Sequence, residues 1–267
     1  MVGVTLFFFW QKQKAKRLQS DAYKISAIIQ TGPEKEALKT AYLAELLGLS
    51  ADRPMPLYAL NTKQAEKLLM RSPLIASAKV KRLPPSTLYI DYEVRKPIAK
   101  LVGYQNMAID KEGYIFPVHP FLTPKKLPEI YLGIPSLKGG RIEGPALDLA
   151  IHILQFLEKS AGFEDLRIQR VDVSNAFTQS LGTKEVVLVT EEELSMRKNG
   201  VEIVCVFPKI LRVAPKDYER QIQHFFSLRK VMLEDYKKQL LILDRGGKFA
   251  PRIIDLRIPQ LAFVEKG

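Results

Sequence analysis

Side chains that commonly carry out catalysis or bind metals are few in this sequence and lie far apart. The histidines are His119, His152 and His224, and none of them has a second histidine or a carboxylate at the spacing of metal ligands. Asp110 and Glu112 form a closely spaced pair of carboxylates, but a lysine separates them and the glycine that follows indicates a solvated turn. We therefore expect no catalytic pair, no metal site and no cofactor.

Phosphate-binding and nucleophile motifs are missing as well. The stretch LDRGGKF, residues 243–249, holds a glycine pair but follows neither the GxGxxG nor the GxxxxGK[ST] pattern, so a turn explains it better. The sequence also lacks GxSxG, the motif of nucleophile elbows. Cys205, the single cysteine, lies in the apolar run VEIVCVF and is expected to be a buried small hydrophobic residue. These features favour a binding protein over an enzyme.

The composition is that of a folded protein with an excess of positive charge. Of the 267 residues, 46% are apolar and 26% are charged, which is ordinary for globular proteins and sufficient for one large domain or two small ones. Lysine and arginine number 41 against 29 acidic residues, which gives a net charge of +12. An anionic partner such as nucleic acid or lipid headgroups would suit that charge, but its spread along the chain is more typical of a solvated surface.

The N-terminal stretch Val2–Trp10 is apolar and is followed by a basic run. It is shorter than the roughly 20 residues that span a bilayer, and its positive charges follow the apolar run, whereas those of a secretory signal precede it. We interpret it as the trailing part of a membrane helix, with a buried apolar terminus as the alternative. The membrane-anchoring residues would be Leu6, Phe7, Phe8, Phe9 and Trp10.

Residues 23–97 are predicted to form a β-α-α-β-β unit. A short strand within residues 23–32 is followed by a helix from Pro33 to Ser50. A second helix begins after Asn61, a favourable N-cap, and ends before Pro73, because the residue that precedes a proline disfavours the helical conformation.

The clearest pattern in that unit is a hairpin within residues 77–94. Leu88, Ile90, Tyr92 and Val94 alternate with more polar residues, which is the period of a half-buried strand. The preceding run SAKVKRL alternates in the same way, and a proline-rich turn joins the two runs. The unit is therefore expected to be a three-stranded sheet with two helices on one face, an α+β arrangement.

Residues 98–267 are predicted to be a strand-rich unit with two helices. Two short strands flank the turn at residues 110–113, and the helices begin at Pro145 and Pro215, since proline is well tolerated in the first turn of a helix. Further strands are expected at residues 166–173, 185–190, 201–213, 237–247 and 250–266.

The hairpin belongs to an ordered set of motifs. SPLIASAKVKRLPPSTLYIDYEVRKPIAKL, residues 72–101, is followed by IDKEGYIF at residues 109–116 and by IIDLRIPQLAFV at residues 253–264. This order resembles the signature of the FtsQ/DivIB family of bacterial division proteins. The residues that carry the resemblance include Pro73, Ala78, Val80, Arg82, Pro85, Leu88, Ile90, Glu93, Arg95, Pro97, Ala99, Asp110, Gly113, Phe116, Leu127, Pro128 and Gly133.

The resemblance implies an organisation and a role for the chain. Residues 1–22 would be a partial transmembrane segment and a basic stalk, residues 23–97 a POTRA-like domain, and residues 98–267 an FtsQ-type β domain. The protein would cross the bacterial inner membrane once, with most of the chain in the periplasm. It would have no enzymatic activity and would act as a divisome scaffold that links early division proteins to septal peptidoglycan synthesis.

The resemblance also implies a partner-binding site at the final strand. FtsB- and FtsL-like division proteins would bind there by β-strand addition, and other divisome proteins would bind the POTRA-like domain. Ile254, Leu256, Arg257 and Ile258 would form the binding strand, with Arg257 pairing with an acidic residue of the partner. We expect this strand to lie at an exposed sheet edge, and a plain terminal strand is the alternative.

Two other functions stay open. A POTRA-bearing protein of outer-membrane assembly or secretion would show repeated units or the many alternating strands of a barrel. A nucleic-acid-binding protein would gather exposed aromatic residues with lysine and arginine on one sheet face. In this sequence Tyr89 lies beside Asp91 and Glu93, so we expect no nucleic-acid partner.

Overall fold

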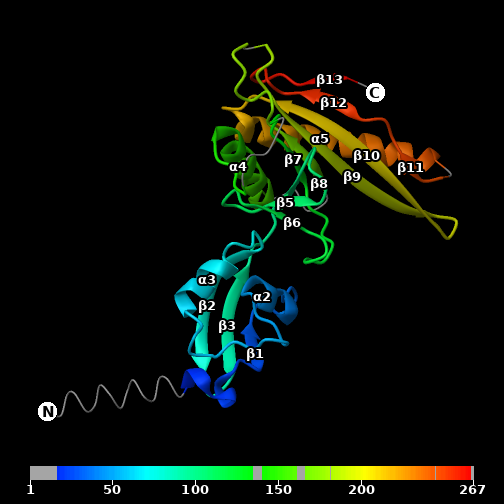
Figure 1. Ribbon diagram of the computed structural model, residues 1–267. Helices are drawn as coiled ribbons and strands as arrows, with labels where there is room; N and C mark the ends of the chain where they lie inside the picture. Colours follow the sequence, from blue (N-terminus) through cyan, green and yellow to red (C-terminus); the bar gives the residue numbers. More distant parts are fainter. Residues whose placement is uncertain (1–16, 135–139, 161–165, 181, 244, 266–267) are drawn as a thin grey trace. The chain divides into compact units, whose positions relative to one another are not determined.

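The computed structural model describes residues 17–134, 140–160, 166–180, 182–243 and 245–265 (Figure 1). The chain divides into two compact units. The first comprises the residues up to Lys96 together with Phe116–Pro124, and the second comprises Pro97–Ile115 and the residues from Lys125 onward. The first boundary falls beside Pro97, where the sequence pattern changes, but that pattern gave no sign that Phe116–Pro124 would lie with the first unit.

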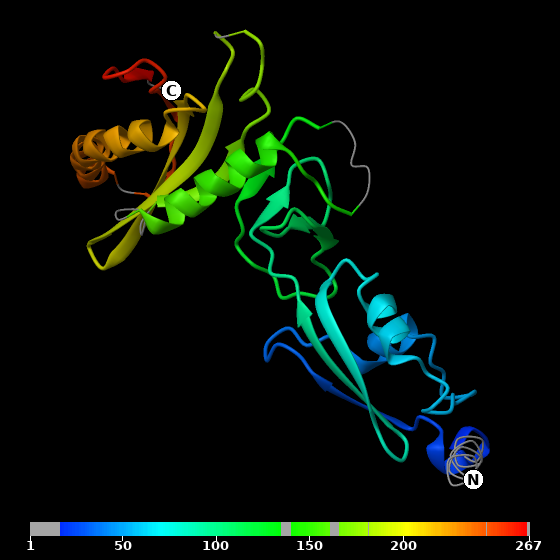
Figure 2. The same cartoon turned by 90° about the vertical axis from the view of Figure 1, so that its left-hand side faces the viewer.

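The first unit is a three-stranded sheet with two helices. β3 (Thr87–Val94) lies at the centre, parallel to β1 (Ala27–Thr31) and antiparallel to β2 (Ile75–Leu83). The helices α2 (Thr40–Leu46) and α3 (Thr62–Leu69) lie on the same side of this sheet (Figure 2). A single 3-10 turn, η1 (Asp21–Tyr23), precedes β1. The predicted β-α-α-β-β order and the α+β class are confirmed.

The face of β3 that the sequence pattern marked as apolar is the face that the helices cover. Leu88 and Ile90 are fully buried, and Tyr92 is almost so. The Tyr92 hydroxyl accepts a hydrogen bond from the Leu38 backbone N–H (2.7 Å) and donates one to the Gln30 side-chain carbonyl (3.3 Å). The Leu38 amide is thus bonded to the sheet and not to a helical carbonyl, which explains why α2 begins at Thr40 and not at Pro33 as predicted.

The second unit is built on one long, mixed sheet with two helices. β9 and β10 form its longest pair and are antiparallel throughout, whereas β12 and β11 both lie parallel to β10. The helices are α4 (Pro145–Lys159) and α5 (Tyr218–Ile242). The strands, in their order across the sheet, are β13 (Phe263–Glu265), β12 (Arg252–Asp255), β10 (Val201–Val213), β9 (Val186–Lys198), β8 (Leu166–Asp172), β7 (Glu129–Tyr131), β4 (Ala99–Leu101), β5 (Met107–Ile109) and β6 (Ile115–Pro117), with β11 (Gly247–Lys248) paired to β10 outside that order.

The predicted strand at residues 237–247 is wrong, because α5 continues to Ile242 and, among the described residues of this range, Gly247 alone belongs to a strand, the short β11. Met232, Tyr236 and Leu240 are all buried, and they follow one another at intervals of four residues. Residues four apart lie on one face of a helix, so the apolar stripe of α5 simply continues past Leu233. The predicted turn at residues 110–113 is confirmed, and Gly113 takes a φ of 84° at its end, before β6.

Beneath α5, the buried face of the sheet carries a cluster of charged side chains. Lys209 on β10 and Glu192 on β9 are fully buried and form an ion pair. The Arg229 guanidinium, on α5, bonds to the other oxygen of the same carboxylate (Nη2–Oε1 2.6 Å, Nε–Oε1 2.8 Å). One carboxylate therefore accepts hydrogen bonds from two cations, which offsets the cost of taking these charges out of water. Burial nevertheless lowers the pKa of Lys209.

Tyr236 closes this cluster on the side of α5. Its ring stacks on Phe207 at a centroid distance of 4.0 Å, and the Lys209 ammonium lies 5.1 Å from its centre. The Arg252 guanidinium also lies over the ring, at 4.9 Å. The Tyr236 hydroxyl is buried and has no hydrogen-bond partner in the described part of the chain. The aromatic ring of Tyr236 therefore stabilises the fold through its contacts, whereas the hydroxyl contributes no hydrogen bond to the described residues.

Replacing Tyr236 with Phe is expected to leave the free energy of unfolding unchanged or slightly raised at neutral pH, because no hydrogen bond is lost. Burial raises the pKa of Tyr236 from 10.0 to about 12. Between these two pKa values the folded protein keeps a proton that the unfolded chain releases, so the wild-type protein should become less stable as the pH rises above 10. The Tyr236→Phe variant should lose less stability over the same range of pH. Chemical denaturation at pH 7 and at several pH values above 9 measures both effects. A decrease of about 1 kcal/mol in the free energy of unfolding at neutral pH, the usual net contribution of one hydrogen bond, would contradict the expectation.

Candidate partner-binding site

The strand predicted to bind a partner is not the edge of the sheet. β12 lies between β10, to which it is parallel, and β13, to which it is antiparallel. Ile254 is fully buried and Leu256 is nearly so, and both belong to the core of the second unit. The expectation of an exposed edge at residues 254–258 is therefore wrong. The side chains of Ile254 and Leu256 pack inward, and Ile258 is half exposed.

The chain reverses direction directly after this segment and forms the true edge. The Leu261 N–H donates to the Ile258 carbonyl (3.2 Å), and Gln260 takes a positive φ of 63°. β13 then returns along β12, with Val264 opposite Ile254. Pro259 was the signal available in the sequence, because proline cannot donate within a ladder and commonly marks the end of a strand. The pattern of residues 261–265 could then have been interpreted as a separate strand.

β13 and the turn that precedes it carry exposed apolar side chains. Leu261, Phe263 and Val264 have 56%, 59% and 43% of their surface exposed. Figure 1 shows β13 at the margin of the second unit's sheet, beside β12. Among the described residues β13 pairs with β12 alone, so its other side presents unpaired main-chain groups. We call this strand, with Ile258 and Leu261 of the preceding turn, the C-terminal edge.

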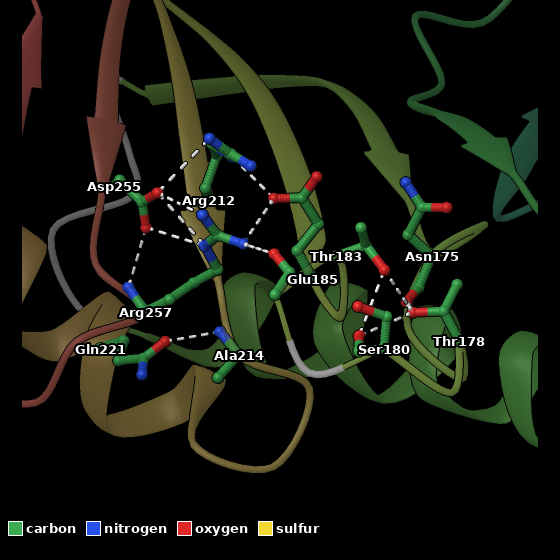
Figure 3. A network of polar contacts seen from close by, with 11 residues as sticks. Asn175, Thr178, Ser180, Thr183, Glu185, Arg212, Ala214, Gln221, Asp255 and Arg257 are labelled. Atoms are coloured by element: carbon green, nitrogen blue, oxygen red, sulfur yellow. Dashed lines mark hydrogen bonds and ion pairs between the residues drawn. The ribbon is translucent and has the colours of Figure 1, made fainter.

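Arg257 is held inside the second unit by several carboxylate and carbonyl groups (Figure 3). Its Nη2 and Nε lie 2.7 and 3.0 Å from the two oxygens of Asp255, and its backbone N–H donates to the same carboxylate (3.1 Å). Its Nη1 donates to the Gly182 carbonyl (3.0 Å) and lies 3.4 Å from Glu185. The guanidinium thus connects the end of β12 to the segment that precedes β9.

A second arginine completes this network. Arg212, on β10, bonds to Glu185 (2.6 Å) and lies 3.4 Å from Asp255. Two arginines and two carboxylates therefore alternate across β10, β12 and the segment before β9, as Figure 3 shows. Burial opposes ionisation of Asp255, but the hydrogen bonds and charge of Arg257, with the charge of Arg212, lower its pKa below the usual value. The network fixes the point from which the chain turns into β13.

The other residues considered for chemistry have structural surroundings. Asp110 is buried, not solvated as predicted, because its carboxylate accepts hydrogen bonds from the backbone N–H groups of Glu112 (3.0 Å) and Tyr114 (2.8 Å) and so closes the turn. His152 and His224 are exposed on α4 and α5, and Cys205 is buried as predicted. Within the described residues, no group of three or more histidine, cysteine, aspartate or glutamate side chains could hold a metal ion.

The proposed anchor residues Leu6, Phe7, Phe8, Phe9 and Trp10 lie outside the described residues. In the part of the chain that is described, no helix combines the length and the apolar character needed to cross a membrane.

The family comparison concerns the first unit. Residues 23–92 match the family model described as a POTRA domain of the FtsQ type. The chain carries an FtsQ-type POTRA domain. The matched range runs from the last residue of η1 to Tyr92, near the end of β3, and so covers the β-α-α-β-β order seen in the structure. No curated protein matches the chain.

The match confirms the resemblance to the FtsQ/DivIB family over the POTRA domain. A POTRA domain of this type indicates a cell-division protein that acts through protein–protein interactions. The match ends before the second unit, so the binding site in that unit is argued from its own geometry.

Proposed function

We propose that this protein is a membrane-anchored scaffold of the divisome. On this proposal the apolar residues Leu6–Trp10 belong to an inner-membrane anchor, and both units lie on the periplasmic side. The FtsQ-type POTRA domain supports a role in division, where it would contact other divisome proteins. The second unit would bind FtsB- and FtsL-like proteins and so connect early division proteins with septal peptidoglycan synthesis.

The observation that carries the partner proposal is the C-terminal edge. A short strand at a sheet edge, paired on one side alone, can accept a strand from another chain, with main-chain hydrogen bonds supplying affinity and alternate side chains supplying specificity. Phe263 and Val264 are next to each other in β13, so their side chains point to opposite faces of the sheet, and both are exposed. A partner strand added there would cover apolar surface on both faces.

The site proposed here differs by one strand from the one that the sequence suggested. Ile254 and Leu256 support the proposed edge from within the core, and Arg257 fixes the turn that leads to it. The side chains in the partner interface would be the exposed apolar ones, which a partner would shield from water: Ile258, Leu261, Phe263 and Val264. Of the four residues first predicted, only Ile258 remains a direct contact.

Replacing Phe263 with Lys and Val264 with Pro together is expected to weaken binding of an FtsB-like partner at least about tenfold, because a proline and a lysine both oppose strand addition at an edge. The measurement is co-purification and titration of the purified chain with the FtsB-like and FtsL-like proteins of the same cell. Val231→Lys, which changes an apolar α5 residue of 69% exposure, is the matched control. Equal binding by the edge variant and the control would remove the C-terminal edge as the partner site.

A further inference from the structure

A groove in the second unit has features of a binding site and shares no residue with the C-terminal edge. It is an open groove of about 860 Å³, lined by residues of α4, of β8 and of the segments that precede β4 and β7, and by Lys111 of the turn between β5 and β6. That volume is within the range of roughly 300–1,000 Å³ found for ligand-binding pockets. The described residues that line it all belong to the second unit.

The floor of this groove is apolar and only partly covered. Ile98, Leu127, Leu154 and Ile168 contribute to it, and each is half-buried. Ile98, Leu154 and Ile168 also pack against the core of the second unit, so the floor is a fixed surface. Partly exposed aliphatic side chains gathered in a concave surface gain stability when a partner's apolar groups exclude water from them.

The described residues at the rim of the groove carry mainly positive charge. Lys126, Lys159 and Arg167 are exposed at its margin, and Lys111, which lies 3.8 Å from Glu112, adds a fourth cation. Of the groove-lining residues that the structure describes, Glu158 is the one with an acidic side chain. An apolar floor with a basic rim is complementary to a segment that has one apolar face and carboxylates beside it.

We propose that this groove binds an acidic, amphipathic segment of a partner protein, separately from the partner strand at the C-terminal edge. Apolar side chains of the segment lie on the floor, at the spacing of one face of a helix, and its carboxylates pair with Lys126, Lys159 and Arg167. A second copy of this chain is a poor occupant, because its net charge of +12 would repel the basic rim. A lipid surface is also disfavoured, because the cations border a concave recess and do not form a flat basic face.

The test uses the full chain and a defined probe. The probe is a fluorescein-labelled synthetic helical peptide with leucine on one face and glutamate on its flanks, and the comparison peptide replaces each glutamate with lysine. The groove variant is Lys126→Glu with Lys159→Glu. The matched control is Lys216→Glu with Lys238→Glu, two exposed lysines of the same unit that lie outside the groove, so the net charge changes equally.

Fluorescence anisotropy should show saturable binding of the acidic peptide to the wild-type chain, at least about tenfold weaker binding to the groove variant, and little change for the control. The lysine peptide should bind the groove variant better than it binds the wild type. The variant Phe263→Lys with Val264→Pro should bind the acidic peptide normally, which separates this proposal from that of the C-terminal edge.

Three results would overturn the proposal. The first is the absence of saturable binding by the acidic peptide. The second is an equal loss in the groove variant and the matched control, which would show a response to net charge alone. The third is binding of vesicles of phosphatidylglycerol and phosphatidylcholine that depends on Lys126 and Lys159 while the peptide does not bind, which would assign the groove to lipid.

Discussion

Replacing Glu192 with Gln is expected to lower the free energy of unfolding of the second unit by about 3–5 kcal/mol, the usual cost of breaking a buried ion pair by removing one partner. Glu192 is fully buried, and its two oxygens bond to Lys209 and Arg229. A neutral amide would leave two buried cations without a counter-charge, and the Lys209 ammonium already has a pKa lowered by burial. Denaturation followed by circular dichroism measures the loss.

The neighbouring residue supplies a matched control for this change. Glu193 is exposed on the same strand, so Glu193→Gln removes the same charge from solvent and should change stability by less than about 0.5 kcal/mol. Hydrogen exchange of the β9 and β10 amides should be faster in Glu192→Gln alone. If the two variants were equally stable, the buried cluster would contribute nothing to the fold.

Replacing all three charged residues with apolar ones separates two quantities: the net contribution of the cluster to the free energy of unfolding, and the loss caused by removing one charge alone. Changing Glu192, Lys209 and Arg229 together to leucine or methionine removes all three charges at once, so no charge is left buried alone. Such replacements are often neutral or stabilising in other proteins. We therefore expect the triple variant to be more stable than Glu192→Gln, measured in the same denaturation experiment.

Alternation and capping made the first unit predictable from the sequence. Leu88, Ile90 and Tyr92 had to share a face, and that face is the buried one. Asn61 predicted the start of α3, and its side chain accepts a hydrogen bond from the Gln64 backbone N–H (3.1 Å). The start of α2 was not predictable, because it depends on the Tyr92 hydroxyl, which lies 54 residues away from Leu38 in the sequence.

The candidate site was less predictable, for a physical reason. Whether a strand is an edge depends on where the chain goes afterwards. Pro259 indicates that the strand ends, but nothing local shows that the turn at Ile258–Leu261 returns the chain as β13 along β12. The buried charges were also hidden. The acidic run at residues 191–193 suggests a solvated surface, and only the phase of the buried alternation from Val186 through Leu188 places Glu192 on the inner face.

Arg257→Glu is the second large effect that we expect, a loss of roughly 2–4 kcal/mol, because charge-assisted hydrogen bonds contribute about 1.5–3 kcal/mol each and the new carboxylate would face Asp255 and Glu185. Arg220→Glu, at an exposed position on α5, is the matched control. The change should also alter the response to acid. The pKa of Asp255 is lowered in the folded state, so its stabilisation is present above the usual pKa of 3.8 and is lost as the pH falls through the lower folded value. In denaturation experiments between pH 2 and pH 5, the variant should lack the part of the acid-induced loss of stability that comes from protonation of Asp255.

Partner binding by variants of Arg257 decides whether this residue contacts the partner or positions the edge. Arg257→Lys keeps the charge but cannot reproduce the planar set of bonds to Asp255 and Gly182. If Arg257 positions the edge, hydrogen-exchange protection of the β13 amides and affinity for an FtsB-like partner should fall together in both the Lys and the Glu variants. A loss of affinity with unchanged protection of β13 would instead place the guanidinium in the partner interface. We expect the parallel loss, because the groups that would pair with an incoming carboxylate are already bonded within the second unit.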